Sequence, residues 1–125
     1  MGVDATIFVL AGNGFDNIEF TEASFRLVRN RELWPLLEAM PARGEPCVLC
    51  LPQGAWSGYS DGTRPAEAEG CELGYLACDS YNNPLRLYDV RDLPDGGDDV
   101  YAKNAAIFAL IKATWPERQV TIVWH

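Results

Sequence analysis

At 125 residues, with 48% hydrophobic, 11% aromatic and 22% charged residues, the chain has the composition of an ordinary globular protein. These proportions exclude collagen-like, coiled-coil and intrinsically disordered classes, and we expect one domain spanning residues 1–125. The formal net charge is −8, and residues 61–100 alone carry ten acids and three arginines, whereas residues 101–125 carry one acid and three bases. Phosphate backbones would repel this chain, so we expect no nucleic-acid binding and favour a basic partner.

The sequence contains no signal for a membrane-spanning segment and has a single histidine. There is no run of about 18 apolar residues and no basic segment before the short apolar run at residues 7–11, so we expect no membrane contact and a cytoplasmic protein. His125 is the single histidine. Most catalytic triads and metal sites that depend on histidine are therefore excluded.

The first half of the chain predicts a strand, a helical region and a second strand. Residues 5–11 (ATIFVLA) are apolar on both alternating faces, which is typical of a central strand covered on both sides. After the break at residues 12–14, Thr21 resembles a helix N-cap, and a helical region is expected from there. Residues 31–40 (RELWPLLEAM) have leucines at helical spacing, and Cys47–Leu51 predicts a buried strand between two prolines.

The second half predicts a hairpin, a helix and a final strand. Residues 53–70 are rich in Gly, Ser, Pro and acids, which indicates a long loop or a ragged hairpin. Leu73–Cys78 and Leu85–Val90 are strand-like, and the asparagines between them favour a tight turn. A helix follows, capped by Asp98 or Asp99, and one face of it is expected to carry Val100, Asn104, Ile107, Phe108, Ile111 and Trp115. Residues 120–124 alternate as a last strand.

This order of elements predicts an α+β fold. We expect a mixed or mainly antiparallel sheet of about five strands with two to three helices in a single layer on it, because a hairpin dominates the middle and few connections are long enough for parallel crossovers.

The four cysteines allow two interpretations. Cys47, Cys50, Cys71 and Cys78 superficially resemble a four-thiolate zinc site. Two residues three apart on a strand point to opposite faces, however, and the second pair is widely spaced. We therefore favour buried free thiols and expect no metal.

The glycine-containing loop after the first strand is the most enzyme-like feature. Gly12–Asp16 resembles the N-terminal loop of abortive-infection proteins with a Sir2-like nucleotide fold, and Gly14–Glu19 resembles the first loop of the DJ-1/PfpI superfamily. These resemblances imply a small nucleotide- or ligand-binding enzyme. The DJ-1/PfpI group implies a reactive cysteine, usually followed by histidine, and this chain has no such pair. The alternative is a turn that needs the backbone freedom of glycine.

No arrangement of carboxylates or serines predicts catalysis. The acids cluster in loop-like stretches, and the serines lack a base nearby in sequence. We therefore expect a protein that is not an enzyme and that uses no cofactor.

The C-terminal segment carries a further resemblance. An alanine-rich helix at residues 105–111, Trp115-Pro116 and a terminal strand ending on Trp124 resemble the C-terminal signature of a family of immunity proteins from bacterial polymorphic-toxin systems. Trp115 departs from the basic residue or glycine usual there. Members are small, frequently acidic α+β proteins that neutralise secreted toxin domains, often nucleic-acid deaminases. The resemblance implies an immunity protein.

These observations together predict a protein-binding module that docks an acidic surface on a basic toxin domain. Interfaces of this kind are anchored by aromatic side chains and steered by complementary charge. A homodimer is the alternative use of such a surface. The candidate partner-binding residues are Trp56, Tyr59, Asp61, Glu67, Glu69, Tyr81, Asp95, Asp98 and Asp99.

Overall fold

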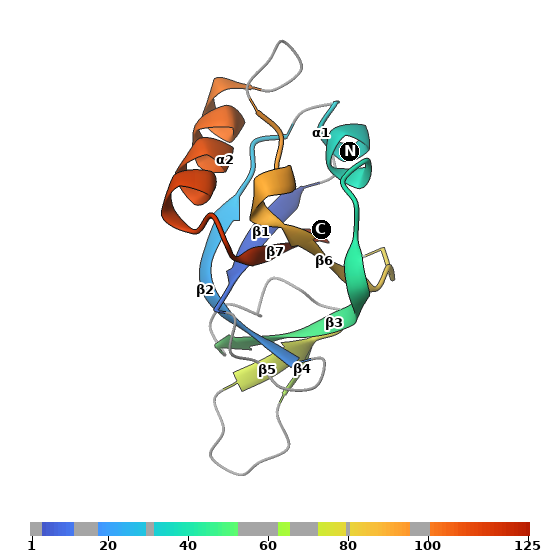
Figure 1. The fold of residues 1–125 in the computed structure, drawn as a ribbon. Helices are drawn as coiled ribbons and strands as arrows, with labels where there is room; N and C mark the ends of the chain where they lie inside the picture. Colours follow the sequence, from blue (N-terminus) through green and yellow to red (C-terminus); the bar gives the residue numbers. More distant parts are fainter. Residues whose placement is uncertain are drawn as a thin grey trace.

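The computed structural model describes residues 4–11, 18–29, 32–52, 63–65, 73–79, 81–95 and 101–125 (Figure 1). Its elements in chain order are β1 (Ala5–Leu10), β2 (Ile18–Arg26), α1 (Leu33–Glu38), β3 (Arg43–Pro52), β4 (Thr63–Pro65), β5 (Leu73–Leu76), β6 (Leu85–Asp89), the 3-10 turn η2 (Val90–Asp92), α2 (Ala102–Thr114) and β7 (Gln119–Trp124). Neither described helix has the length and apolar character needed to cross a bilayer.

The strands form a mixed sheet that curves back on itself. Its order is β2-β1-β7-β6-β3-β5-β4, and a further pairing joins β2 to β3. The β2–β3 pair is parallel, and the other pairs are antiparallel. Five strands, β2, β1, β7, β6 and β3, therefore close a ring, and β5 and β4 extend the sheet beyond β3. The predicted α+β class is confirmed.

The first strand is the centre of the molecule, as its sequence predicts. All six residues of β1 are buried, and β1 pairs with β2 on one side and β7 on the other. Ile7 and Val9 belong to the core under the helices, whereas Phe8 and Leu10 belong to a second core with Leu49 of β3. Alternation along one apolar strand thus supplies both cores.

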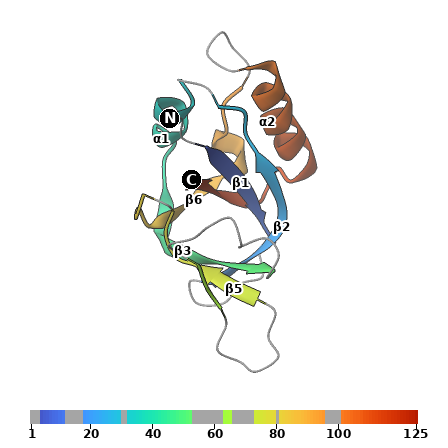
Figure 2. The same cartoon turned by 180° about the vertical axis from the view of Figure 1, so that it is seen from behind.

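The two helices share one core. α2 buries Phe108 and Ile111, and α1 buries Leu33 and Leu37, in the same cluster as Ile7. The two views show α2 and α1 over opposite flanks of the curved sheet, with both chain ends close to α1 (Figures 1 and 2). The predicted helices at residues 31–40 and before Pro116 are both present, but the second begins at Ala102 with Tyr101 as its N-cap residue, so the predicted cap at Asp98 or Asp99 is wrong.

The helical prediction from Thr21 is wrong. Residues 18–26 form strand β2, which pairs with both β1 and β3. Glu22, Ser24 and Arg26 are exposed, whereas the residues between them are partly buried, so the burial alternates with the period of a strand. Pairing on two edges outweighs the weak local N-cap signal.

The predicted hairpin is also wrong in its pairing. β5 and β6 both run antiparallel to β3, β5 beside Leu49–Pro52 and β6 beside Arg43–Cys47. Between them the described residues show only one isolated bridge, Cys78 with Pro84. The turn itself is present, and Asn82 takes a left-handed conformation with φ 64°. Residues 77–84 thus form an excursion between two strands on the same edge of β3.

Candidate functional site

The structure tests the placement of only two predicted partner-binding residues. Tyr81 is 48% exposed and contacts Trp34 of α1. The carboxylate of Asp95 is exposed and accepts a hydrogen bond from Lys112 of α2 at 2.7 Å, and this contact lowers the pKa of Asp95. The two residues thus serve different parts of the fold. The other candidates lie outside the described residues: Trp56, Tyr59, Asp61, Glu67, Glu69, Asp98 and Asp99.

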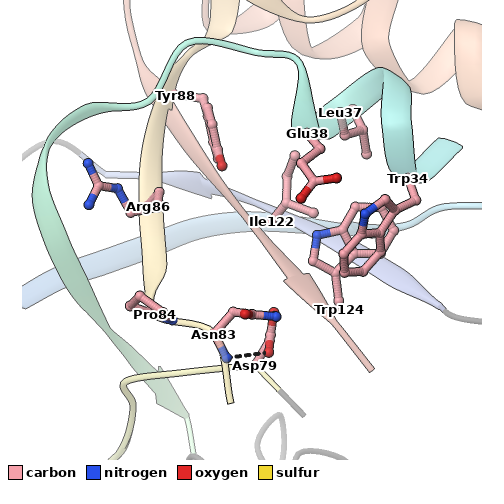
Figure 3. A pocket seen from close by; sticks show the side chains of 10 residues that line it. All are labelled: Trp34, Leu37, Glu38, Asp79, Asn83, Pro84, Arg86, Tyr88, Ile122 and Trp124. Carbon is pink, nitrogen blue, oxygen red and sulfur yellow. Dashed lines mark hydrogen bonds between the residues drawn. The ribbon is translucent and has the colours of Figure 1, made fainter. Parts of the chain in front are cut away.

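A surface cavity of about 260 Å³ lies between α1, the ends of β6 and β7, and the turn that carries Tyr81 (Figure 3). We call it the tryptophan groove. It is lined by Trp34, Leu37, Glu38, Asp79, Asn83, Pro84, Arg86, Tyr88, Ile122 and Trp124.

Two tryptophans from distant parts of the chain build one side of the groove, and Tyr81 packs on one of them from outside the lining. The ring centres of Trp34 and Trp124 lie 4.4 Å apart, and Tyr81 meets Trp34 edge to face at 6.4 Å. Leu33 and Leu37 are buried and fix α1 on the core, so Trp34 between them is held at the surface over the end of β7. Aromatic pairs with these geometries are favourable beyond the area they bury. The groove therefore has a preorganised aromatic wall.

The buried carboxylate of Asp79 organises the turn beside this wall. It is 3% exposed. Its Oδ1 accepts the backbone N–H groups of Tyr81 and Asn83, both at 2.9 Å, and its Oδ2 accepts the side-chain amide of Asn83 at 3.4 Å. This is the arrangement by which Asp substitutes for a backbone turn partner. Asp79 therefore positions Tyr81 and lines the groove at the same time.

The remaining polar groups of the groove differ in where they point. Figure 3 shows the Glu38 carboxylate and the Tyr88 hydroxyl toward the middle of the cavity and the Arg86 guanidinium directed away from the two tryptophans. Arg86 donates to the backbone oxygen of Gly44 at 2.9 Å. Burial raises the pKa of Tyr88, which keeps its hydroxyl neutral.

A separate ion cluster joins the two ends of the described chain. The carboxylate of Asp4, 12% exposed, accepts from Arg29 at 2.7 Å and from Arg26 at 3.0 Å. The hydrogen bonds and charge of Arg29, and to a lesser degree of Arg26, hold the pKa of Asp4 at about 2 against the cost of burial. Asp4 and His125 also exchange two backbone hydrogen bonds, and His125 bonds to the hydroxyl of Thr6 at 2.8 Å. The cluster fastens β1 beside β7 and has the features of a structural site.

The described cysteines lie in or near the core. Cys47 and Cys50 are buried and Cys78 is half-buried, whereas Cys71 lies outside the described residues. Burial raises the pKa of Cys47 to about 11, so its thiol is a poor nucleophile. The described part of the chain contains no group of three or more side chains able to hold a metal.

The loop Gly12–Asp16 lies outside the described residues, so its chemistry stays a prediction. At its start, the guanidinium of Arg118 donates to the backbone oxygens of Leu10 and Ala11 and pairs with Glu22 at 3.3 Å. These contacts hold the end of β1 in place.

Sequence reasoning missed the tryptophan groove. Residues 34, 79 and 124 are far apart in the chain, and no local pattern predicts that they meet. The sequence predicts Trp124 on a terminal strand and Trp34 within a helix, but only the docking of α1 across the ends of β6 and β7 brings them together. Comparisons with protein-family models, with curated proteins and with solved structures found no match.

Proposed function

We propose that this chain is a protein-binding module that neutralises a basic protein, in the manner of the immunity proteins of bacterial toxin systems. The observation that carries the proposal is the tryptophan groove, in which Trp34 and Trp124 form an aromatic wall, together with the exposed Tyr81 that packs on Trp34 beside the groove. Binding energy at protein interfaces concentrates in such aromatic anchors. Preorganised anchors also reduce the entropy lost on association.

The charge of the chain supports a basic partner. The net charge is −8, and Glu38 and Asp79 both line the groove. An acidic surface attracts a basic partner over a Debye length of about 8 Å at physiological salt and speeds association. The proposal places the chain in the cytoplasm, where free thiols such as Cys47 persist.

The test compares two tyrosines of nearly equal exposure, Tyr81 at 48% and Tyr101 at 52%. Binding to a toxin domain encoded beside the gene is measured for Tyr81→Ala and for the control Tyr101→Ala. We expect Tyr81→Ala to raise Kd at least about tenfold, because it removes an anchor of the aromatic wall, and Tyr101→Ala to leave Kd unchanged. Equal affinities for wild type and Tyr81→Ala would remove the groove from the interface.

A second measurement tests the contribution of charge. Association rates at several ionic strengths are compared between wild type and a variant with four acids changed to lysine: Glu67, Glu69, Asp95 and Asp98. We expect slower association and a flatter salt dependence in the variant. Coincident salt slopes would show that these acids only keep the protein soluble. Because Asp95 pairs with Lys112, the single variant Asp95→Lys serves as the stability control.

One observation favours a second candidate, assembly through α2. Leu110 is 51% exposed, and the alanines at 102, 106, 109 and 113 of the same helix are exposed at spacings of four, three and four residues. Helices that are apolar on all faces are usually buried. If α2 is an interface between copies, the wild type forms dimers as its concentration rises, and Leu110→Glu abolishes them. A monomer at all concentrations in light scattering rejects this candidate.

A further inference from the structure

We propose that the tryptophan groove accepts one arginine side chain of the partner, whose guanidinium pairs with Asp79 and Glu38. This inference rests on the proposed function and specifies the chemistry that the groove recognises. Three features of the described residues carry it: the size of the cavity, a buried carboxylate that pairs with none of their cations, and the direction of Arg86, the basic side chain in the lining.

The size of the cavity suits a side chain. Sites for drug-sized ligands and cofactors occupy roughly 300–1,000 Å³, and the groove measures about 260 Å³. Its walls include Leu37, Ile122 and the two indoles, which lie tilted against each other and offer apolar surface to a methylene stem. Long basic side chains bury their stems on such surface and leave their charge at the polar end.

Asp79 is the strongest indication of a cationic ligand. It is 3% exposed, it lines the cavity, and within the part of the chain that the structure describes no Lys, Arg or His pairs with it. Buried carboxylates are usually paired with a cation. Oδ1 is occupied by two backbone N–H groups, whereas Oδ2 accepts only the amide of Asn83 at 3.4 Å. A carboxylate oxygen has two lone-pair sites, so Oδ2 can accept a further donor.

The rest of the lining favours arginine over other cations. Figure 3 shows the Glu38 carboxylate on the opposite side of the cavity from Asp79, and the Tyr88 hydroxyl also directed toward the cavity from β6. Arg86 is turned outward onto the oxygen of Gly44, so its charge is directed away from the cavity. A guanidinium has five donors in one plane and stacks on aromatic rings, so it can reach acceptors on two sides, whereas an ammonium is a single compact charge.

The test titrates the protein with N-acetyl-arginine amide and observes the indole N–H signals in two-dimensional NMR. We expect saturable binding with Kd in roughly the millimolar range, since one side chain is a small ligand. The signals of Trp34 and Trp124 move, whereas that of Trp115, which packs on Phe25, stays in place. N-acetyl-citrulline amide has nearly the same shape without the charge and causes no shift.

Two variants and a control locate the charge that matters. Glu38→Gln weakens binding about threefold or more, because an exposed carboxylate contributes modestly. Asp79→Asn weakens it about tenfold, and its amide oxygen still accepts the N–H groups of Tyr81 and Asn83. Glu117→Gln, an exposed acid that does not line this groove, leaves binding unchanged.

The outcomes separate this inference from the proposed function. Equal binding of the arginine and citrulline probes, or an unchanged Kd for Glu38→Gln, overturns the arginine site even if the partner toxin binds. Absence of any partner while the arginine probe binds with the expected variant effects supports the site and rejects the neutralising function.

Discussion

The side chain of Asn104 offers a sharp test of how α2 is held on the sheet. It is fully buried, its Oδ1 accepts the backbone N–H of Val28 at 2.7 Å, and its Nδ2 donates to the backbone oxygen of Val28 at 2.9 Å. One amide thus satisfies both backbone groups of a residue that follows β2 and has left the sheet. The perturbation is Asn104→Ala.

The expected cost follows from these two bonds. Each hydrogen bond of this kind contributes about 1 kcal/mol net, and a buried backbone group left without a partner costs about 1–3 kcal/mol. Val28 is half-buried, so water replaces part of the loss, and alanine is a better helix former than asparagine by about 0.5 kcal/mol. We expect the free energy of unfolding to fall by about 2–3 kcal/mol. For a domain of this size that lowers Tm by roughly 6–12 °C.

The assay is urea unfolding followed by circular dichroism, with thermal melts in parallel. Lys103→Ala is the control, since it changes the exposed neighbour in the same helix and should stay within about 0.5 kcal/mol of wild type. Asn104→Asp keeps the acceptor for the Val28 N–H but brings a carboxylate oxygen close to the Val28 carbonyl oxygen. As the pH falls, the carboxyl group becomes protonated and can donate a hydrogen bond to that oxygen, so the destabilisation relative to wild type should shrink. If Asn104→Ala and Lys103→Ala have equal stability, the two bonds do not hold α2.

Three further predictions concern other parts of the fold. The pKa of Asp4 is lowered to about 2 from 3.8, so its ion pairs stabilise the protein above about pH 4, and this stability is lost as the pH falls through 2. Discounted for its two exposed arginines, Asp4→Asn should cost about 1–2 kcal/mol at pH 7 and much less near pH 2 in denaturant titrations. Cys47 has a buried thiol with a pKa raised to about 11, so it should react with iodoacetamide far more slowly than Cys78 in the native protein, and rapid labelling of Cys47 would contradict its place in the core. A chelator should leave Tm unchanged. Gly44 has φ +69° with open space around it, so Gly44→Ala should cost about 1 kcal/mol through backbone strain alone, and an unchanged urea midpoint would argue against this conformation.

Local patterns in the sequence were enough to predict β1, α1, α2 and β7. Each of them has apolar residues at the period of its own secondary structure, and the same residues form the two cores. The α+β class follows from the order of these elements. The turn near Asn82 was also predictable, because asparagine tolerates a left-handed backbone.

The strands β3, β5 and β6 were also predictable from local apolar runs, but tertiary structure alone decided how they pair and what residues 18–26 form. Residues 18–26 became a strand because β1 and β3 supply edges on both sides, and β5 and β6 lie end to end on β3 because that edge is long enough for both. Asn104 was predictable as part of a core-facing surface, but not its partner, Val28, 76 residues away. The groove depends in the same way on contacts among residues 34, 79 and 124. The periodicity of a sequence indicates which face of a helix or strand is buried. It does not indicate what packs against that face, because the contacting residues are distant in the chain and no local pattern predicts them.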